Sequence, residues 1–135
     1  MIPSVPSAEK LLIGLLREQL PGVQVVTLIP APEVRRLPLV WVHRTGGAAT
    51  HPLWLDQAAV SVECWAQQRT AAAELAQSAR TALWAAYRTQ AERPQGHIAS
   101  YAEVSGPSEV RTRDQPDQLH RYLATYTLGI RPPRP

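Results

Sequence analysis

The chain holds 135 residues, the length of one domain, and 44% of them are hydrophobic, which is enough to form a core without disulfides or metal. Its one cysteine, Cys64, excludes an internal disulfide and a cysteine-rich zinc site. The formal net charge is +3, but the arginines are scattered, and no Lys/Arg-rich run indicates a nucleic-acid-binding arm. No window approaches the ~18 apolar residues of a membrane helix. The first ten residues lack the pattern of a signal peptide, so we expect a soluble intracellular protein without a membrane partner.

The first predicted element is an amphipathic helix, with Ser7 as its N-cap and Pro21-Gly22 at its end. Its apolar stripe at helical spacing consists of Leu12, Leu15, Leu16 and Leu20. Two strands are predicted next, at residues 23–29 and 37–44, with prolines between them. Residues 45–57, "TGGAATHPLWLDQ", are predicted to form a long polar loop.

A third strand is predicted at residues 58–67, with Cys64 as a buried thiol rather than a nucleophile. The strongest helical pattern covers residues 69–90, where Thr70 can cap the N-terminus. The buried stripe of this helix is mostly alanine, so the helix can approach a sheet closely. The stripe consists of Ala72, Leu75, Ala76, Ala79, Leu83 and Ala86.

Two more strands close the chain. Residues 97–105 alternate, and Gly106-Pro107 is predicted to break that strand. A polar loop at 108–120 precedes a final strand at 121–131, and a short proline-rich tail, 132–135, follows it. The order α-β-β-β-α-β-β predicts one α+β domain spanning the chain. Its mixed or antiparallel sheet has about five strands, with both helices on one face.

Residues with catalytic potential do not form a recognisable motif. The histidines are not spaced as ligands of a helical zinc site, and we expect them to be hydrogen-bonded or solvated at the surface. They are His43, His51, His97 and His120. Asp114 and Asp117 could bind a cation, but turn formation explains Asp-Gln-Pro-Asp better. Gly46-Gly47 lacks phosphate-loop spacing and is predicted to let the chain turn. We therefore expect no enzyme activity, no metal and no cofactor.

Leu53, Trp54 and Leu55 form an apolar cluster inside the predicted polar loop. Such a cluster is costly to leave in water. Two explanations stay open at this point. The loop folds back to cover the core, or it contacts another protein chain, because Trp and Arg are enriched at protein interfaces.

Several segments resemble one family of phage proteins when they are taken in order. They are "PLVWVHRTGG" at 38–47, "VECWA" before the alanine-rich helix, Gly106-Pro107, the Asp-containing loop, and "RYLATYTLGIR" at 121–131. In this order the chain resembles the tail-terminator, or tail-completion, proteins of long, non-contractile-tailed phages of GC-rich hosts. The resemblance covers nearly the whole chain and consists of order and spacing, not of a catalytic signature.

This resemblance implies a structural virion protein. Family members are α+β proteins that form rings, usually of six subunits, on the last ring of the tail tube. The ring stops tail polymerisation and offers a surface for head joining. The implied partners are other copies of the chain, the major tail tube protein and head–tail connector proteins. Genome DNA would pass the lumen without specific binding. The implied location is the neck end of the tail, after assembly in the host cytoplasm, and no family catalytic residues exist to carry over.

A closed ring needs two complementary patches on every subunit. The loop around Trp54 and the polar loop 107–120 are the two candidates, and mixed Arg and Asp side chains in the second suit ionic contacts that set register. The candidate contact residues are Leu53, Trp54, Leu55, Arg44, Arg111, Arg113, Asp114 and Asp117.

Two other functions remain open from the sequence. A head–tail connector or neck protein has a similar size and element order. A small basic nucleic-acid-binding module is a different class, motivated by the net charge of +3 and by aromatic residues on strand faces, such as Tyr122 and Tyr126.

Overall fold

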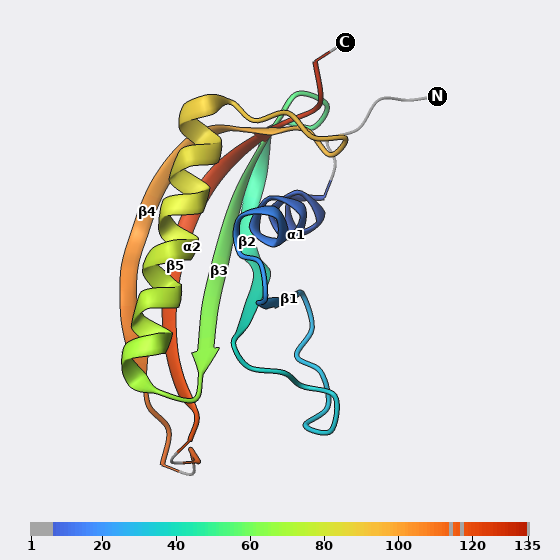
Figure 1. Cartoon of the computed structure of the whole chain (residues 1–135). Helices are drawn as coiled ribbons and strands as arrows, with labels where there is room; N and C mark the ends of the chain where they lie inside the picture. Colours follow the sequence, from blue (N-terminus) through green and yellow to red (C-terminus); the bar gives the residue numbers. More distant parts are fainter. Residues whose placement is uncertain (1–6, 114, 117, 135) are drawn as a thin grey trace.

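The computed structural model describes residues 7–113, 115–116 and 118–134. It contains two helices and a five-stranded sheet with the strand order β1-β2-β3-β5-β4 (Figure 1). β1 runs parallel to β2, and every other neighbouring pair is antiparallel. Both helices lie on one face of the sheet. The prediction of an α+β fold with a mixed five-stranded sheet is confirmed.

Helix α1 (Ala8–Gln19) begins where the sequence predicts, because the Ser7 side chain accepts a hydrogen bond from the backbone N–H of Lys10 at 3.4 Å. Its apolar stripe is buried and packs over β1 and β2 and beside the second helix. The Arg17 guanidinium donates to the carbonyl oxygen of Val25 at 3.0 Å, which ties the last turn of the helix to β1.

Strand β1 (Gln24–Val26) is much shorter than the predicted strand 23–29. It pairs only with the first three residues of β2 (Leu39–His51). After β1 the backbone bonds to a side chain instead of a strand: the Trp41 indole N–H donates to the carbonyl oxygen of Thr27 at 2.9 Å. Most of β2 therefore has no strand neighbour on this side among the described residues.

The predicted loop 45–57 is wrong, because β2 continues to His51 and β3 (Leu55–Ala66) begins four residues later. The two strands form one long hairpin with a bulge near Gly46. Gly47 has φ +96°, and a Cβ atom there would lie 2.1 Å from the carbonyl oxygen of Gln57. The glycine lets two strands approach in a bulged hairpin and does not open a coil.

Helix α2 (Arg69–Thr89) follows β3 after a short turn. Its N-cap residue is Gln68, which makes no side-chain capping bond, so the prediction that Thr70 caps the helix is wrong. The alanine-rich stripe is buried as predicted, and the helix packs against β3, β4 and β5. Because the stripe residues are small, the helix axis can lie close to the sheet.

Strand β4 (His97–Val110) continues through Gly106 and Pro107, where a break was predicted. Two register shifts, between Glu103 and Ser108, absorb these residues. β4 is an outer strand of the sheet, where a proline without an N–H donor is tolerated. β5 (His120–Arg131) lies between β3 and β4.

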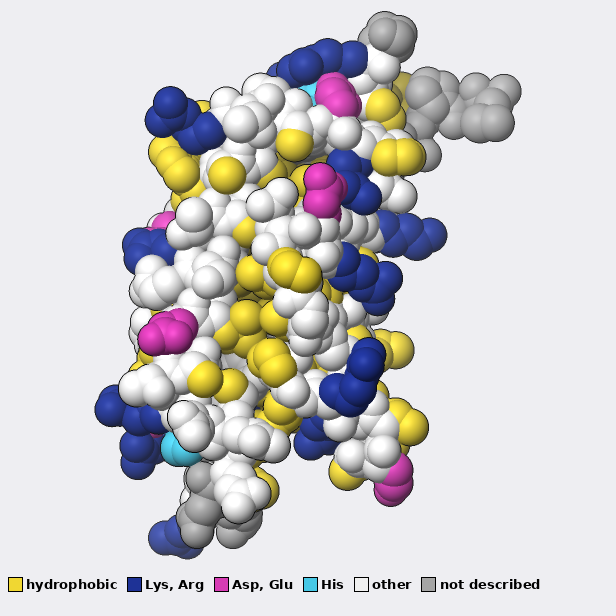
Figure 2. Space-filling view, in the orientation of Figure 1, with side chains coloured by type: hydrophobic (Ala, Val, Ile, Leu, Met, Phe, Trp, Pro, Cys, Tyr) yellow, Lys and Arg dark blue, Asp and Glu magenta, His cyan; other side chains and the backbone are white. Residues whose placement is uncertain are grey.

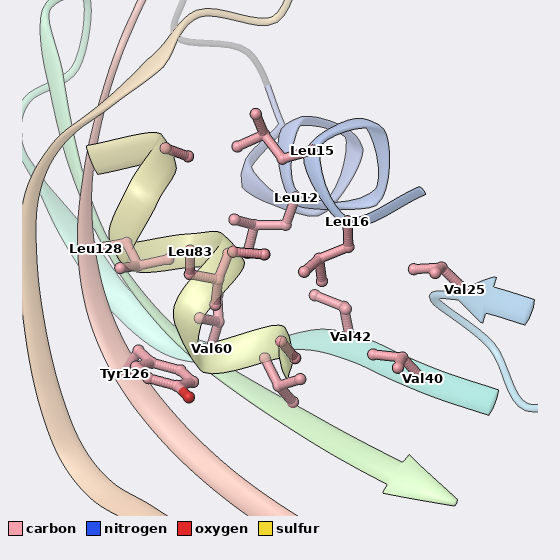
Figure 3. Close-up of a cluster of buried hydrophobic side chains, with 14 of the residues drawn as sticks. Leu12, Leu15, Leu16, Val25, Val40, Val42, Val60, Leu83, Tyr126 and Leu128 are labelled. Carbon is pink, nitrogen blue, oxygen red and sulfur yellow. The ribbon is translucent and has the colours of Figure 1, made fainter. Parts of the chain in front are cut away.

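The core fills the space between the helices and the covered face of the sheet. Side chains from α1, α2 and all five strands belong to this core, and Figure 3 shows part of it. Among them are Leu12, Leu16, Val25, Val40, Val42, Val60, Leu83, Tyr126 and Leu128. In the described part of the chain, no helix combines the length and apolar character needed to cross a membrane.

Candidate interaction surfaces

The two loops proposed from the sequence lie at opposite ends of the sheet. β3 pairs with β5 from Asp56↔Ile130 at one end to Ala66↔His120 at the other. The tip of the β2–β3 hairpin is at the first end, and the connection between β4 and β5 is at the second (Figure 1). The twelve residues of β3 correspond to a distance of about 40 Å between the ends. The two loops are therefore not neighbours within one subunit.

Trp54 projects from the hairpin tip, with 54% of its surface exposed. A tight turn fixes it: the Trp54 N–H donates to the carbonyl oxygen of His51 at 3.1 Å, and the Leu53 N–H donates to Nδ1 of His51 at 3.2 Å. Leu53 and Leu55 are half-buried. A hollow of about 420 Å³ lies beside Trp54, lined also by His97 and Arg131. Trp54 thus does not fold back into the core, although its two neighbours are partly covered.

Arg44, a second candidate contact residue, forms a two-pronged ion pair inside the hairpin. Its guanidinium lies 2.5 and 2.8 Å from the two carboxylate oxygens of Asp56, and its Nε donates to the carbonyl oxygen of Gly46 at 2.9 Å. The hydrogen bond to Asp56 raises the pKa of Arg44. The backbone N–H of Arg44 also donates to a carboxylate oxygen of Glu9 at 3.1 Å. Most donors of this side chain are therefore used within the subunit.

The other end of the sheet carries an ionic cluster around Glu109. Its carboxylate accepts hydrogen bonds from Arg69 and Arg111, and from the Tyr122 hydroxyl at 3.3 Å. The bonds from Arg69 and Arg111 lower the pKa of Glu109 to about 2, with the Arg69 bond as the largest cause. Arg113, two positions after Arg111 in the sequence, is exposed. The candidates Asp114 and Asp117 lie outside the described residues.

Groups that could perform chemistry are dispersed. In the described ranges no cluster of three His, Cys, Asp or Glu side chains could hold a metal ion. Cys64 is buried as predicted, and burial raises the pKa of its thiol to about 12. His97 is also buried, with Nδ1 lying 3.2 Å from a carboxylate oxygen of Glu92, so it is not a surface histidine. His43 stacks on Trp41 with ring centroids 4.0 Å apart.

Half of the 14 basic residues form ion pairs within the chain, which keeps a net charge of +3. Seven arginines among the described residues form ion pairs with carboxylates: Arg44, Arg69, Arg80, Arg93, Arg111, Arg121 and Arg134. On the face shown in Figure 2, basic side chains are spread along both sides and do not gather into one patch. This arrangement does not resemble the continuous basic stripe of a nucleic-acid-binding surface.

A group of aromatic side chains lies between α2 and β4, and none of its members is among the contact residues expected from the sequence. Trp84 is 43% exposed and lies 5.2 Å from Tyr101 and 5.4 Å from Tyr87, measured between ring centroids. A hollow of about 370 Å³, lined by Arg80 and Glu103 as well, opens beside Trp84 and Tyr101. The spacing of Trp84 and Tyr87, three residues apart on a helix, was the available signal.

Comparisons with known proteins extend over almost the whole chain. A family model described as "Phage tail termination protein" matches residues 4–135. The chain is 26% identical over 136 residues to the Gene 22 protein of Mycobacterium phage D29, covering 97% of this chain and 96% of that protein. A chain from the virion of a native gene transfer agent particle is 13% identical, with a TM-score of 0.36, covering 92% of this chain and 87% of that one.

Proposed function

The chain belongs to the phage tail termination proteins, structural components of phage tails, and we propose that its copies form a closed ring that caps the tail tube. The ring, expected to contain six copies, ends tail polymerisation and presents the surface to which the head is joined. The ring is assembled in the host cytoplasm and stays in the virion at the neck end of the tail. The family match over residues 4–135 carries this proposal.

The shape of the subunit suits a component placed between two different partners. One end of the sheet presents the apolar hairpin tip with Trp54, and the other presents the ionic cluster of Glu109 and Arg111. A ring built by side-to-side contacts leaves both ends free. In this arrangement one end meets the tail tube and the other meets the head–tail connector. The two loops expected from the sequence as patches of the ring contact are proposed here as contacts with the tail tube and the connector instead, because they lie at opposite ends of the sheet. The proposed contact residues are Leu53, Trp54, Leu55, Arg111, Arg113, Asp114 and Asp117, while Arg44 supports the first end from within.

The pairing of arginines with carboxylates supports free passage of DNA through the ring. Seven of the 14 basic residues pair with six carboxylates within the subunit, which reduces the positive charge available to hold the phosphate backbone in the lumen. The alternative of a nucleic-acid-binding module loses one of its motives, the aromatic residue Tyr126 on a strand face. Tyr126 is 1% exposed on the helix-covered face, where it cannot stack on a base.

Mass measurement of the purified protein, with and without tail-tube protein, tests the proposal. We expect a discrete oligomer that electron microscopy shows as a ring, and that binds the ends of tail tubes and stops their growth. A protein that stays monomeric at micromolar concentration and neither binds tubes nor limits their length would contradict the proposal. Antibody labelling at the neck end of the virion tail, compared with its distal tip, separates a terminator from components of the distal tip, and labelling of purified tails without heads separates it from a connector that stays with the head.

A further inference from the structure

We propose that neighbouring copies join edge to edge, with β4 of one copy pairing antiparallel to the uncovered part of β2 in the next copy. This inference rests on the proposed ring and specifies which strands make its contact. The occupant of each edge is a second copy of this chain. Four features of the described residues support it: the two open edges, the directions of the two edge strands, the matching height of their regular segments within the sheet, and the charges on these segments.

Both outer sides of the sheet have backbone that no strand pairs with. On β2 two of these backbone groups bond to side chains, the Arg44 N–H to Glu9 and the Gly46 carbonyl oxygen to Arg44 Nε. β1 covers β2 only at Leu39, Val40 and Trp41, and β2 continues to His51. In the described chain no strand pairs with β2 on that side after Trp41, and residues 45–51 are exposed. β4 is the opposite outer strand and is fourteen residues long. Long edges with free N–H and C=O groups are templates for pairing with another chain.

The directions of the two edges are complementary. β2 is antiparallel to β3, β3 to β5, and β5 to β4, so β2 and β4 run in opposite directions. Copies related by rotation about a ring axis keep the same sense along that axis. β4 of one copy therefore meets β2 of the next in an antiparallel arrangement. This contact uses a different edge on each side, as a head-to-tail ring requires.

The two edges also have regular segments at the same level. Residues 46–48 of β2 pair with residues 57–59 of β3. The same residues of β3 pair with 127–129 of β5, which in turn pair with 100–102 of β4. Bulges flank both outer segments, so each is a short straight stretch. Because all copies in a ring share one height, the segment of one copy faces that of the next. The expected register places Ala48 opposite Ser100.

Charges do not oppose this contact. Proteins that avoid edge pairing place lysine, unpaired charges or proline on the edge. Residues 46–49, Gly-Gly-Ala-Ala, carry no charged side chain. In residues 100–103 the one charge is Glu103, which forms an ion pair with Arg80 at 2.7 Å. Pro107 lies farther along β4, outside the segment expected to pair.

A disulfide test measures the contact directly. Directly opposed residues of antiparallel strands have Cα atoms about 4.5–5.5 Å apart, within the range a disulfide spans. The double variant Ala48→Cys with Ser100→Cys is expected to form intermolecular disulfides on mild oxidation. On a non-reducing gel these give a ladder up to the full ring, which collapses to monomer with reductant. The native Cys64 is buried and is not expected to react.

Matched controls fix the interpretation. Either single cysteine variant should give no ladder. The pair Ala48→Cys with Thr127→Cys should also fail, because Thr127 lies on the interior strand β5, one strand farther from the neighbouring β2. The pair Gly46→Cys with Ala102→Cys repeats the test two residues along each strand, should the first variant fold poorly; Gly46 has open space for a Cβ atom. Circular dichroism checks the fold of each variant.

The outcomes separate this inference from the proposed function. Ladders from both level-matched pairs support edge pairing. Rings of normal mass without cross-links overturn edge pairing and leave the capping ring intact. A single Ser100→Cys variant that forms only dimers indicates a two-fold β4–β4 contact and also overturns the inference. A wild-type protein without any oligomer overturns both.

Discussion

At the scale of single residues, Gly46 and Gly47 are neighbours with different conformational demands. Gly47 has φ +96°, and a Cβ atom there would lie 2.1 Å from the Gln57 carbonyl oxygen and 2.8 Å from the Ala59 nitrogen. We expect Gly47→Ala to reduce the free energy of unfolding by about 2 kcal/mol or more, because it combines an unfavourable φ with a backbone clash. Urea unfolding followed by circular dichroism measures this loss.

The control is Gly46→Ala, which meets no atom within 4 Å. We expect this variant to change the free energy of unfolding by less than about 0.5 kcal/mol. Equal losses in the two variants would contradict the bulged hairpin described for β2 and β3.

Glu109 gives the protein a pH-dependent contribution at one end of the sheet. Its pKa is lowered from 4.5 to about 2, so the folded state favours the carboxylate. This stabilisation is complete above the unfolded pKa of about 4.5 and is lost as the pH falls through about 2. Glu109→Gln should therefore lower the melting temperature modestly at neutral pH. The difference from wild type should shrink between about pH 4.5 and about pH 2.

Thermal unfolding across this pH range, at low and high salt, checks the prediction. Arg69 and Arg111 are 62% and 71% exposed, so salt should reduce the effect. A difference that stays constant down to about pH 2 would show that the carboxylate charge is not responsible.

At the scale of elements, the β2–β3 hairpin is held by the ion pair of Arg44 and Asp56. Asp56 is 8% exposed and accepts two hydrogen bonds from the guanidinium. Arg44→Ala leaves this carboxylate without its partner, and we expect a loss of about 1–3 kcal/mol in the free energy of unfolding. Arg111→Ala, which removes an arginine that is 71% exposed, should cost less than about 1 kcal/mol. Denaturant unfolding of both variants shows whether Arg44 stabilises the hairpin or behaves like an exposed surface arginine such as Arg111.

The sequence predicted the helices more accurately than the strand ends. Helical stripes repeat over several turns, so the buried faces of α1 and α2 emerged from spacing alone. The sequence does not indicate the β2–β3 hairpin, because Gly46-Gly47-Ala48-Ala49 shows no alternation of apolar and polar residues. These residue types are typical of coil, but in the structure they form part of a bulged strand. β4 was cut short at Gly106-Pro107 because pattern reasoning does not reveal which strand is at the edge of the sheet.

The candidate contacts show a similar division. Trp54 was identified because an apolar cluster in a polar segment is visible in the sequence, and the structure leaves it 54% exposed. Arg44 was named for the same surface, but its partner Asp56 is twelve residues away and becomes visible only when the hairpin is formed. Whether these side chains contact a partner stays a prediction. The family resemblance is confirmed, because the tail termination model matches nearly the whole chain.

At the scale of the whole molecule, the close approach of α2 to the sheet depends on small side chains. Ala79 is 1% exposed on the face of α2 that contacts the sheet. Ala79→Leu should push the helix away and lower the free energy of unfolding by about 1–3 kcal/mol. Ala85→Leu is the matched control, since Ala85 is exposed on the same helix and should tolerate leucine within about 0.5 kcal/mol. Equal effects in denaturant unfolding would contradict the helix packing.

Trp54 belongs to the scale of the assembly. Trp54→Ala should leave folding and ring mass unchanged, because the indole is 54% exposed at the hairpin tip, and its ring centroid lies 6.1 Å from that of His51. Binding to either the tail tube or the head–tail connector should weaken by about 10-fold or more, as is typical when an interface tryptophan is removed. Co-sedimentation with tail tubes and with connector protein measures both contacts. Trp84→Ala removes an exposed tryptophan away from the ends. Because Trp84 packs on Tyr101 of β4, the ring mass of this variant is measured first, and if the ring is intact both contacts should stay unchanged.

The position of β5 determines when a chain becomes fit for assembly. β2 and β3 pair locally, as do β4 and β5, but the two hairpins are joined only when β5 pairs with β3, through residues as distant as Asp56 and Ile130. Pairing between residues so distant in sequence is intrinsically slow, because the loop-closure entropy is lost before the contacts form. Until β5 is in place, β4 is not attached to the rest of the sheet. We therefore expect that a partly folded or truncated chain cannot present its two outer edges in the correct relation, and that only subunits with a complete sheet can join the proposed ring.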